Sequence, residues 1–298
     1  MYSSEYHEHT LAGPAICAGV GIHTGARVRL SIRPSASGTG IVFVRSDVHD
    51  RDNRIPATAA SVTQTTLGTV ITNAEGVSVS TIEHIMAALA ALGIDNAVIE
   101  LDGPEVPIMD GSAQPFVQLL DRAGFRRQDL PQQVIEVLEP VIVTEGDKSA
   151  ALYPCDRFEV RFEIVYDSKA VGHQIVDLEI TEDSFRQELA SARTFGFVHE
   201  VEALRARGLA RGGSLENAVV IDGDDVMNPE GLRYDNECVR HKALDAVGDL
   251  YVLGMPLKAR FVGIKAGHSL NNALVRALLE RPEAYRLVTR APALAAVG

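Results

Sequence analysis

The stretch NECVRHKALDAVGDL, residues 236–250, is the most informative one for the fold, because an earlier stretch, STIEHIMAALAALG at residues 80–93, follows the same plan. Apolar side chains at helical spacing predict a main helix in each stretch. His84 stands early in the first helix and His241 early in the second, and each helix precedes a strand, a glycine and another helix. A chance match of short segments is the alternative. If the duplication is real, two similar halves face each other and each contributes one histidine to a shared cleft.

The rest of the chain predicts an α+β fold of alternating strands and helices. The first half is expected to contain strands at 27–32, 41–44 and 97–101 and helices that start at the N-cap Ser80, in a capping box with Glu83, and near 112. The second half is expected to contain strands across 134–180, helices near 183–191, 198–207, 237–253 and 269–279, and a strand at 258–265. The polar, aperiodic stretch 126–133 is interpreted as the boundary between two domains, residues 1–128 and 134–298.

Composition narrows the class of protein. Lys and Arg number 28 against 40 Asp and Glu, which gives a net charge of −12 and argues against a nucleic-acid binder. Three widely spaced cysteines imply no disulfide framework and favour a reducing compartment. The N-terminal stretch lacks a secretory signal, and the longest apolar run, 85–94, is about half of the ~20 residues that a membrane span needs. We therefore expect a cytoplasmic enzyme or binding protein without a transmembrane anchor.

The second main helix carries a pattern typical of a metal site. His241, Asp245 and Asp249 are spaced i, i+4, i+8, so one helix face presents an imidazole and two carboxylates. A solvated helix face is the alternative interpretation. The apolar residues around the pattern favour a half-buried face, where carboxylates need a partner or a metal. Zinc suits such a set, with His84 as a third ligand and Glu83 beside it as a base. Cys238 is a rival ligand, but we expect a buried, inert thiol.

Two further segments carry side chains suited to acyl chemistry. His268 lies in KAGHS at a strand-to-helix junction, where Asp249 could raise its pKa and keep it a proton donor. Thr194 in ARTFGF could donate to an oxyanion, and Phe195 could cover an apolar or sugar face. The alternatives are an ordinary helix N-terminal residue for His268 and a plain turn with core aromatics for ARTFGF.

Longer motifs carry a resemblance to a known family. The chain contains GVGIHTG at 19–25, STIEHIMAAL at 80–89, GIDNAVIELDGPEVPIMDGSAQPF at 93–116, ARTFGF at 192–197, LRYDNECVRHKALDAVGDLY at 232–251 and KAGHS at 265–269. In these motifs and their order it resembles the UDP-3-O-acyl-N-acetylglucosamine deacetylases, the LpxC family of zinc enzymes of lipid A biosynthesis. The resemblance implies two similar domains, each a β-sheet packed against two main helices, with the active site in the cleft between them.

The resemblance also implies roles for individual residues. One zinc ion per chain is expected on His84, His241 and Asp245. The proton-transfer residues and oxyanion donor are expected to be Glu83 as general base, His268 as general acid, Asp249 as its partner and Thr194. The substrate-contacting residues are expected to be Leu67, Lys148, Phe195 and Lys242. The segment 194–220 matches a βαβ insert that forms the passage for the acyl chain.

The implied reaction is hydrolysis of the N-acetyl group of UDP-3-O-acyl-N-acetylglucosamine to acetate and the free amine. A monomer that makes transient contact with a membrane surface is expected. Two alternatives remain at this point. One is a zinc amidase that acts on another N-acylated sugar or on a peptide. The other is a non-catalytic binding module in which zinc is a structural clasp.

Overall fold

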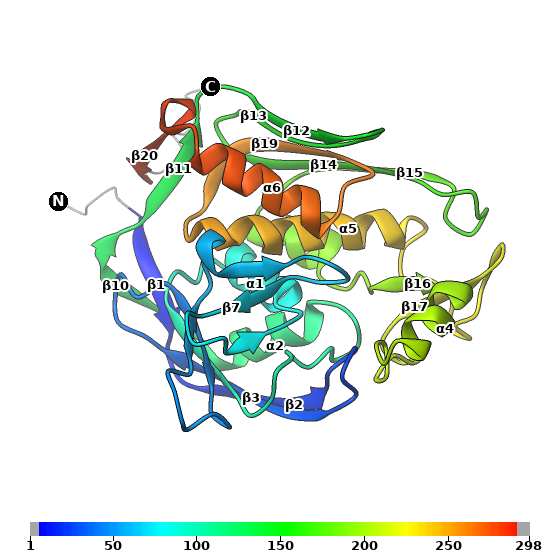
Figure 1. Cartoon of the computed structure of the whole chain (residues 1–298). Coiled ribbons are helices and arrows are strands. Elements are labelled where there is room, and N and C mark those ends of the chain that lie inside the picture. Colours follow the sequence, from blue (N-terminus) through cyan, green and yellow to red (C-terminus); the bar gives the residue numbers. More distant parts are fainter. Residues whose placement is uncertain (1–5, 291–298) are drawn as a thin grey trace.

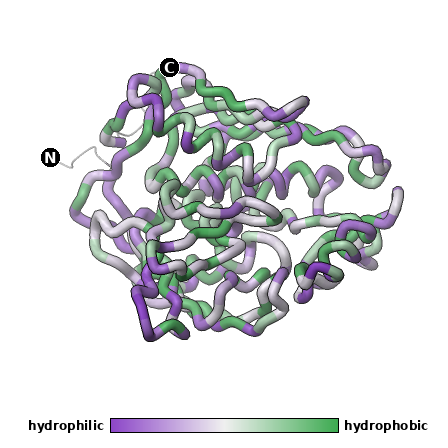
Figure 2. Tube along the Cα trace, in the orientation of Figure 1, coloured by the Kyte–Doolittle hydropathy of each residue, from purple (hydrophilic) through white to green (hydrophobic). Residues whose placement is uncertain are grey.

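The computed structural model describes residues 6–290. Two β-sheets form the outer layers, and the main helices lie between them, as Figure 1 shows. The hydrophobic stretches run along the strands and helices of these layers, while many loops are hydrophilic (Figure 2). This arrangement is the predicted α+β fold.

The two sheets have the same strand order, which supports the predicted duplication. The first sheet consists of β2 (Ala15–Val20), β3 (Arg27–Pro34), β9 (Ala97–Leu101), β4 (Ile41–Arg45) and β5 (Arg54–Pro56), in that order. The second repeats it with β12 (Val141–Glu145), β13 (Lys148–Pro154), β19 (Leu257–Ile264), β14 (Phe158–Val165) and β15 (His173–Glu179). The central strand, β9 or β19, is antiparallel to the neighbour on one side and parallel to that on the other. Strands β11 (Gln133–Val137) and β20 (Tyr285–Thr289) extend the second sheet.

Two helices from each half fill the space between the sheets. They are α1 (Glu83–Ala91), α2 (Gln114–Ala123), α5 (Glu237–Leu250) and α6 (His268–Leu279). Helices α1 and α5 approach each other at Gly248, where an added Cβ would lie 1.9 Å from the carbonyl oxygen of Glu83. Only glycine allows this approach, and it brings His84 of one half beside His241 of the other.

Each half carries a small three-stranded insert immediately before its main helix. The first insert is β6 (Val62–Gln64), β7 (Val70–Thr72) and β8 (Ser78–Val79). The second is β16 (Phe195–Phe197), α4 (Val198–Ala206), β17 (Val219–Asp222) and β18 (Asp225–Val226). Because β16 and β17 are parallel and α4 connects them, the second insert contains the βαβ unit predicted near 194–220. Figure 1 shows it projecting at the edge of the molecule beside α5.

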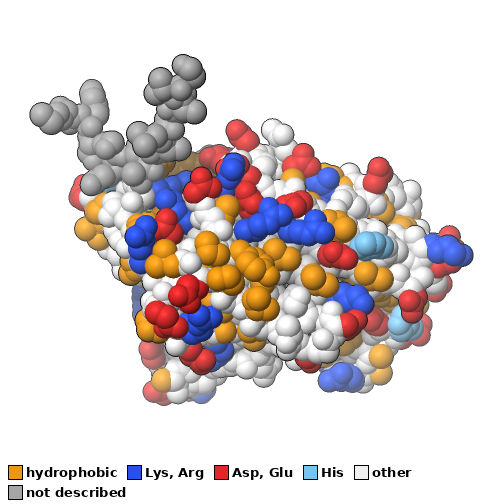
Figure 3. Space-filling view, turned by 90° about the horizontal axis from the view of Figure 1, so that it is seen from above, with side chains coloured by type: hydrophobic (Ala, Val, Ile, Leu, Met, Phe, Trp, Pro, Cys, Tyr) orange, Lys and Arg blue, Asp and Glu red, His pale blue; other side chains and the backbone are white. Residues whose placement is uncertain are grey.

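Shorter elements complete the described chain. They are the helix α3 (Glu182–Ser184), the π-helical turn Phe185–Leu189, and the 3₁₀ turns Ala59–Ser61, Tyr251–Leu253 and Pro282–Ala284. Figure 3, a view from above, shows apolar side chains gathered near the middle of this face with charged side chains around them. Within residues 6–290, no helix is long and apolar enough to cross a membrane.

One strand was not predicted, and one local prediction was wrong. Most of the stretch 126–133, which was interpreted as the domain boundary, belongs to strand β10 (Phe125–Pro131), which pairs antiparallel with β1 (His7–Leu11). Most β10 side chains are exposed, so the strand lacks the apolar alternation by which a half-buried strand is recognised. The predicted capping box at Ser80 is absent. Helix α1 begins at Glu83 with Ile82 as its N-cap, and the Ser80 hydroxyl donates to the carbonyl of Pro104 instead.

Candidate active site and metal centre

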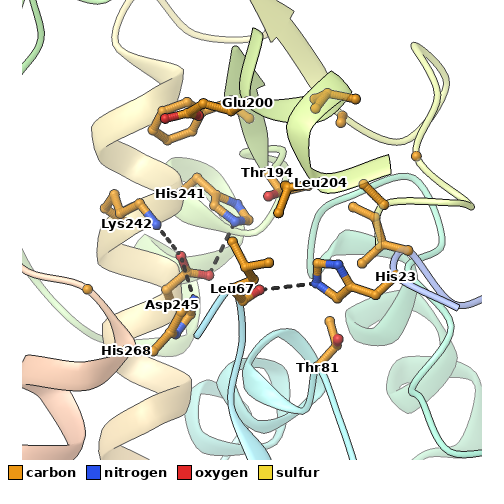
Figure 4. Close-up of a pocket in the computed structure, with 18 of the residues that line it drawn as sticks. His23, Leu67, Thr81, Thr194, Glu200, Leu204, His241, Lys242, Asp245 and His268 are labelled. Atoms are coloured by element: carbon orange, nitrogen blue, oxygen red, sulfur yellow. Dashed lines mark hydrogen bonds and ion pairs between the residues drawn. The ribbon is translucent and has the colours of Figure 1, made fainter. Parts of the chain in front are cut away.

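A cavity of about 710 Å³ lies between the two halves and is lined by both inserts. Figure 4 shows His241, Lys242 and Asp245 on one helix, with Thr194, Leu67 and His268 reaching the same space from other elements. The predicted site residues that line it are Leu67, Glu83, His84, Lys148, Thr194, Phe195, His241, Lys242, Asp245 and His268. Asp249 stands behind His268 and contacts it. The structure therefore brings together every site residue expected from the sequence.

The three expected metal ligands form one buried cluster. Their ligand atoms all lie within 4.8 Å of one another. The Oδ1 atom of Asp245 is 3.2 Å from Nε2 of His241 and 3.5 Å from Nε2 of His84, and the two imidazole rings meet edge to face. The predicted i, i+4 spacing on α5 and the close approach of α1 together create this geometry.

The cluster fits a divalent cation. Oδ1 of Asp245 is buried and accepts no hydrogen bond within residues 6–290. Because buried polar atoms almost always have a partner, this oxygen is free to bind a metal ion. The Nδ1–H of His241 donates to the carbonyl of Ala192 at 3.0 Å, which leaves the Nε2 lone pair directed at the cluster. Burial alone would raise the pKa of Asp245, but the charges of His241 and Lys242 hold this pKa well below its usual range. Two imidazoles and one ionised carboxylate are a typical ligand set for zinc with an open fourth position.

Glu83 lies next to this cluster as the first residue of α1. Its carboxylate is buried, and Oε2 accepts the backbone N–H of Thr69 at 2.9 Å. Burial raises the pKa of Glu83, although the charges of His268 and His84 act against the shift. A carboxylate with a raised pKa beside a metal cluster is suited to accept a proton from water.

His268 and Asp249 form a hydrogen-bonded pair on the other side of the cluster. Nδ1 of His268, the first residue of α6, lies 2.8 Å from Oδ2 of Asp249. Burial acts to lower the pKa of His268, but the carboxylates around it, Asp249 first and then Glu83 and Asp245, together outweigh burial and raise this pKa to about 10. The Nε2 atom points the other way and lies 4.0 Å from Oδ2 of Asp245. This imidazole is therefore held as a cation that faces the cluster, which suits a general acid.

Sequence reasoning missed the side chains that hold these two groups in place. The Thr69 hydroxyl donates to Oδ1 of Asp249 at 2.6 Å, and Nδ2 of Asn271 donates to Oδ2 at 2.9 Å. Thr69 lies in a loop without periodicity, so no pattern singles it out. Asn271 stands three residues after His268, and that helical spacing is the signal that could have found it.

A buried ion pair, also missed, fixes the segment that carries Thr194. The guanidinium of Arg193 and its backbone N–H both donate to Oε1 of Glu237 at 2.9 Å, and both side chains are almost completely buried. The pair ties ARTFGF to the first turn of α5. It thereby places the Ala192 carbonyl against His241 and the Thr194 side chain at the cavity. Arg193 lies in the motif ARTFGF and Glu237 in the motif at 232–251, and these opposite charges were the signal that could have indicated the pair.

A third missed residue, Glu105, organises the GVGIHTG loop. Its carboxylate accepts the backbone N–H groups of His23 and Thr24, each at 2.9 Å, and the Thr24 hydroxyl at 2.7 Å. An added Cβ at Gly21 would lie 2.1 Å from Oε2 of Glu105, so the loop requires glycine there. His23 lines the cavity and its Nε2 lies 3.2 Å from the Leu67 carbonyl oxygen. The motif therefore supports the cavity wall.

The cavity wall carries both charged and apolar side chains, and the charged ones include the acids Glu145, Glu200 and Glu202 as well as lysines. Lys148 lines it as an exposed side chain. Nζ of Lys242 lies 3.2 Å from Asp245 and 5.7 Å from the centre of the Phe195 ring. The apolar lining from the second insert comprises Val198, Val201, Leu204, Leu215, Ala218 and Val220. Cys238 is buried outside the cavity lining, and burial raises the pKa of its thiol to about 12, as expected of an inert cysteine.

Comparisons with known proteins agree with the motifs. The family model described as UDP-3-O-acyl N-acetylglycosamine deacetylase matches residues 8–280. The UDP-3-O-acyl-N-acetylglucosamine deacetylase of Phenylobacterium zucineum is 64% identical over 288 residues, which is 97% of this chain and 98% of the relative. The protein of the same name from Myxococcus xanthus is 47% identical and covers 97% of this chain and 91% of its own length. One from a Shewanella species is 51% identical over 91% of this chain and 89% of its own. The chain therefore belongs to the UDP-3-O-acyl N-acetylglycosamine deacetylase family, LpxC.

Proposed function

We propose that this protein hydrolyses the N-acetyl group of UDP-3-O-acyl-N-acetylglucosamine to give UDP-3-O-acyl-glucosamine and acetate, in lipid A biosynthesis. The observation that carries the proposal is the arrangement around one metal cluster. Glu83 lies on one side of the cluster and His268, which is paired with Asp249, lies on another, and both face a cavity lined by lysines and by apolar side chains. Family membership and the names of the relatives support the same reaction.

The metal is proposed to be one zinc ion on His84, His241 and Asp245. Zinc in a site with three protein ligands makes water a nucleophile near neutral pH and polarises a carbonyl group. The buried Oδ1 of Asp245 and the lone pair of His241, fixed by the Ala192 carbonyl, support this ligand set.

The proton transfers are proposed to use the residues around the cluster. The Glu83 carboxylate takes a proton from the attacking water. The cationic His268 donates a proton to the departing nitrogen, because an amine is a poor leaving group unless it is protonated. The hydroxyl of Thr194 donates to the carbonyl oxygen as negative charge develops on it. Asp249 keeps His268 in its charged form and fixes the direction of its ring.

Each part of the substrate is proposed to contact the side chains of the cavity wall that suit its chemistry. Lys148 and Lys242 provide positive charge for the diphosphate, and Phe195 packs against the sugar. The apolar lining of the second insert receives the acyl chain, and Leu67 covers the opposite wall. The protein is further proposed to act in the cytoplasm as a monomer that touches the membrane surface transiently, with domains at 1–128 and 134–298.

Two other functions give different experimental results. A zinc amidase of other specificity would release acetate faster from an N-acetylated peptide or another N-acylated sugar. A binding module would hold zinc and release no acetate. The test measures acetate release from UDP-3-O-acyl-N-acetylglucosamine and from an N-acetylated peptide, with metal content by elemental analysis. We expect turnover of the UDP-sugar alone. His241→Ala should lose both metal and turnover, whereas His173→Ala, an exposed histidine on β15, should keep both.

A further inference from the structure

Thr69 forms hydrogen bonds with two carboxylates of the proposed proton-transfer residues, Glu83 and Asp249. Its backbone N–H donates to Oε2 of Glu83 at 2.9 Å, and its hydroxyl donates to Oδ1 of Asp249 at 2.6 Å. Thr69 comes from the first insert, whereas Asp249 lies on α5 in the other half of the molecule, 180 residues along the chain. The Thr69 side chain is almost completely buried. A single residue thus connects the carboxylate beside the metal cluster to the carboxylate behind His268.

The hydroxyl of Thr69 determines how Asp249 can use its two oxygens. Oδ2 of Asp249 receives Nδ1–H of His268 and Nδ2–H of Asn271, while Oδ1 receives the Thr69 hydroxyl. With donors on both oxygens, the carboxylate plane is fixed. A free Oδ1 would let the carboxylate rotate and carry the His268 ring with it.

The loop before Thr69 is held close to Glu83. Leu67 has φ +67° and Gly68 has φ +158°, and both values lie in the region that favours glycine. An added Cβ at Gly68 would lie 3.0 Å from Oε1 of Glu83. Leu67 also lines the cavity. The chain therefore turns sharply between a cavity-lining residue and Thr69.

We propose that Thr69 is a positioning residue for the deacetylation, which fixes the proposed base Glu83 and the proposed acid pair His268–Asp249 relative to each other across the interface of the two halves. The inference rests on the proposed function. The backbone N–H positions the Glu83 carboxylate, and the hydroxyl positions Asp249 and, through it, His268. Thr69 touches neither the substrate nor the metal in this role.

Three variants distinguish the effect of the Thr69 hydroxyl from the effect of a change in the loop conformation. Thr69→Val keeps the shape and the backbone N–H to Glu83 but removes the hydroxyl, whereas Thr69→Ser retains a hydroxyl. Thr66→Val removes an exposed hydroxyl from the same loop. We expect Thr69→Val to lower kcat by roughly 10–100-fold, as is usual for a partner of a catalytic group, with KM and zinc content close to wild type. Thr69→Ser should recover most of this loss, and Thr66→Val should lose nothing.

A double-mutant cycle identifies the group through which Thr69 acts. In an Asp249→Asn background the carboxylate that the hydroxyl holds is already gone, so adding Thr69→Val should lower kcat much less than it does in the wild type. The same further loss in both backgrounds would overturn the inference. So would wild-type kcat for Thr69→Val, or equal losses for the Val and Ser variants.

Crystal structures of the Val and Ser variants test the placement without reference to turnover. We expect the Asp249 carboxylate and the His268 ring to be rotated in Thr69→Val and unchanged in Thr69→Ser. Unchanged positions in Thr69→Val would contradict the inference. If the wild type releases no acetate from the UDP-sugar, the proposed function fails, and these structures still decide whether Thr69 positions the pair.

Discussion

His268 and Asp249 lie on different helices, α6 and α5, yet Nδ1 of the imidazole is 2.8 Å from Oδ2 of the carboxylate. The same imidazole turns its Nε2 toward the metal cluster. One nitrogen is therefore engaged by a negative charge while the other faces the proposed reaction site. This relationship makes the protonation state of His268 a property of the folded protein.

The activity should depend on pH in a bell-shaped manner. The acidic limb reports protonation of Glu83, and burial, which raises the pKa of this residue, moves the limb above the ordinary glutamate value. The alkaline limb reports loss of the proton from His268, whose pKa the nearby carboxylates, Asp249 above all, raise to about 10 against burial. A bound dication would lower this pKa by repulsion. Asp249→Asn removes the charge that raises the pKa, so the alkaline limb should move to lower pH by roughly 1–3 units. The acidic limb should move less, and also to lower pH, because the Asp249 charge makes a smaller contribution to the raised pKa of Glu83.

The measurement for this prediction is kcat/KM against pH for the wild type, Asp249→Asn and the exposed control Asp156→Asn. The control should leave both limbs unchanged. An alkaline limb that is the same in Asp249→Asn and in the wild type would show that Asp249 does not set the pKa of the acid.

Glu83 and His268 should each be needed for turnover but not for metal binding. Glu83→Ala and His268→Ala should each lower kcat by roughly 10²–10⁴-fold, the usual effect of removing a positioned base or acid. The double variant should lose less than the product of the two losses, because both residues serve one transition state. Single-turnover kinetics with parallel zinc analysis checks this, with exposed Glu75 replaced by Ala as the control. Retained activity in either single variant would remove that residue from the mechanism.

Lys148 should affect substrate binding more than the chemical step. It lies at the cavity as an exposed cation, and its contact with a diphosphate would be the same in the ground state and the transition state. Lys148→Ala should therefore raise KM with little change in kcat. Lys258→Ala, on β19 of the same sheet but outside the cavity lining, should change neither. A loss confined to kcat would place Lys148 in the chemistry. Lys242 is a less clean test, because it also pairs with Asp245.

Gly248 should be essential for the interface between the halves. Because an added Cβ there would lie 1.9 Å from the Glu83 carbonyl oxygen, Gly248→Ala must separate α1 from α5. We expect the free energy of unfolding to fall by at least about 1–3 kcal/mol, as it does for an overpacked core, and zinc binding to become weaker. Gly13→Ala is the control, since its added Cβ meets nothing closer than 3.9 Å. Thermal unfolding with and without zinc makes the measurement. A Gly248→Ala protein as stable as the wild type would contradict the contact.

The sequence was sufficient to predict the duplicated plan and the grouping of His84, His241 and Asp245. His241 and Asp245 lie four residues apart in one helix, so their relative position depends only on the helix that the local sequence forms. The pairing of α1 with α5 followed from placing His84 at the equivalent position in the other half. Thr194 and Phe195 were candidates from their side-chain chemistry alone. The βαβ insert and the position of Lys148 at the cavity depended on the resemblance to a family, since short segments of this kind carry no pattern of their own.

Tertiary contacts explain what could not be predicted. The role of Thr69 arises because the fold places it against Asp249. A short polar loop carries no sequence pattern that predicts a contact with a residue 180 positions away. Arg193 is charged and therefore expected at the surface, but Glu237 permits its burial by accepting its hydrogen bonds. Strand β10 was missed because strand recognition depends on one buried face, and most of its side chains are exposed.

A zinc titration of the metal-free protein decides whether one zinc ion per chain supports acetate release. The protein is stripped with a chelator, zinc is added in known amounts, and acetate release from UDP-3-O-acyl-N-acetylglucosamine is followed. The account predicts no turnover without metal and a linear rise that reaches its plateau at one zinc ion per chain. Full turnover by the metal-free protein, or one bound zinc ion without any acetate release, would contradict it.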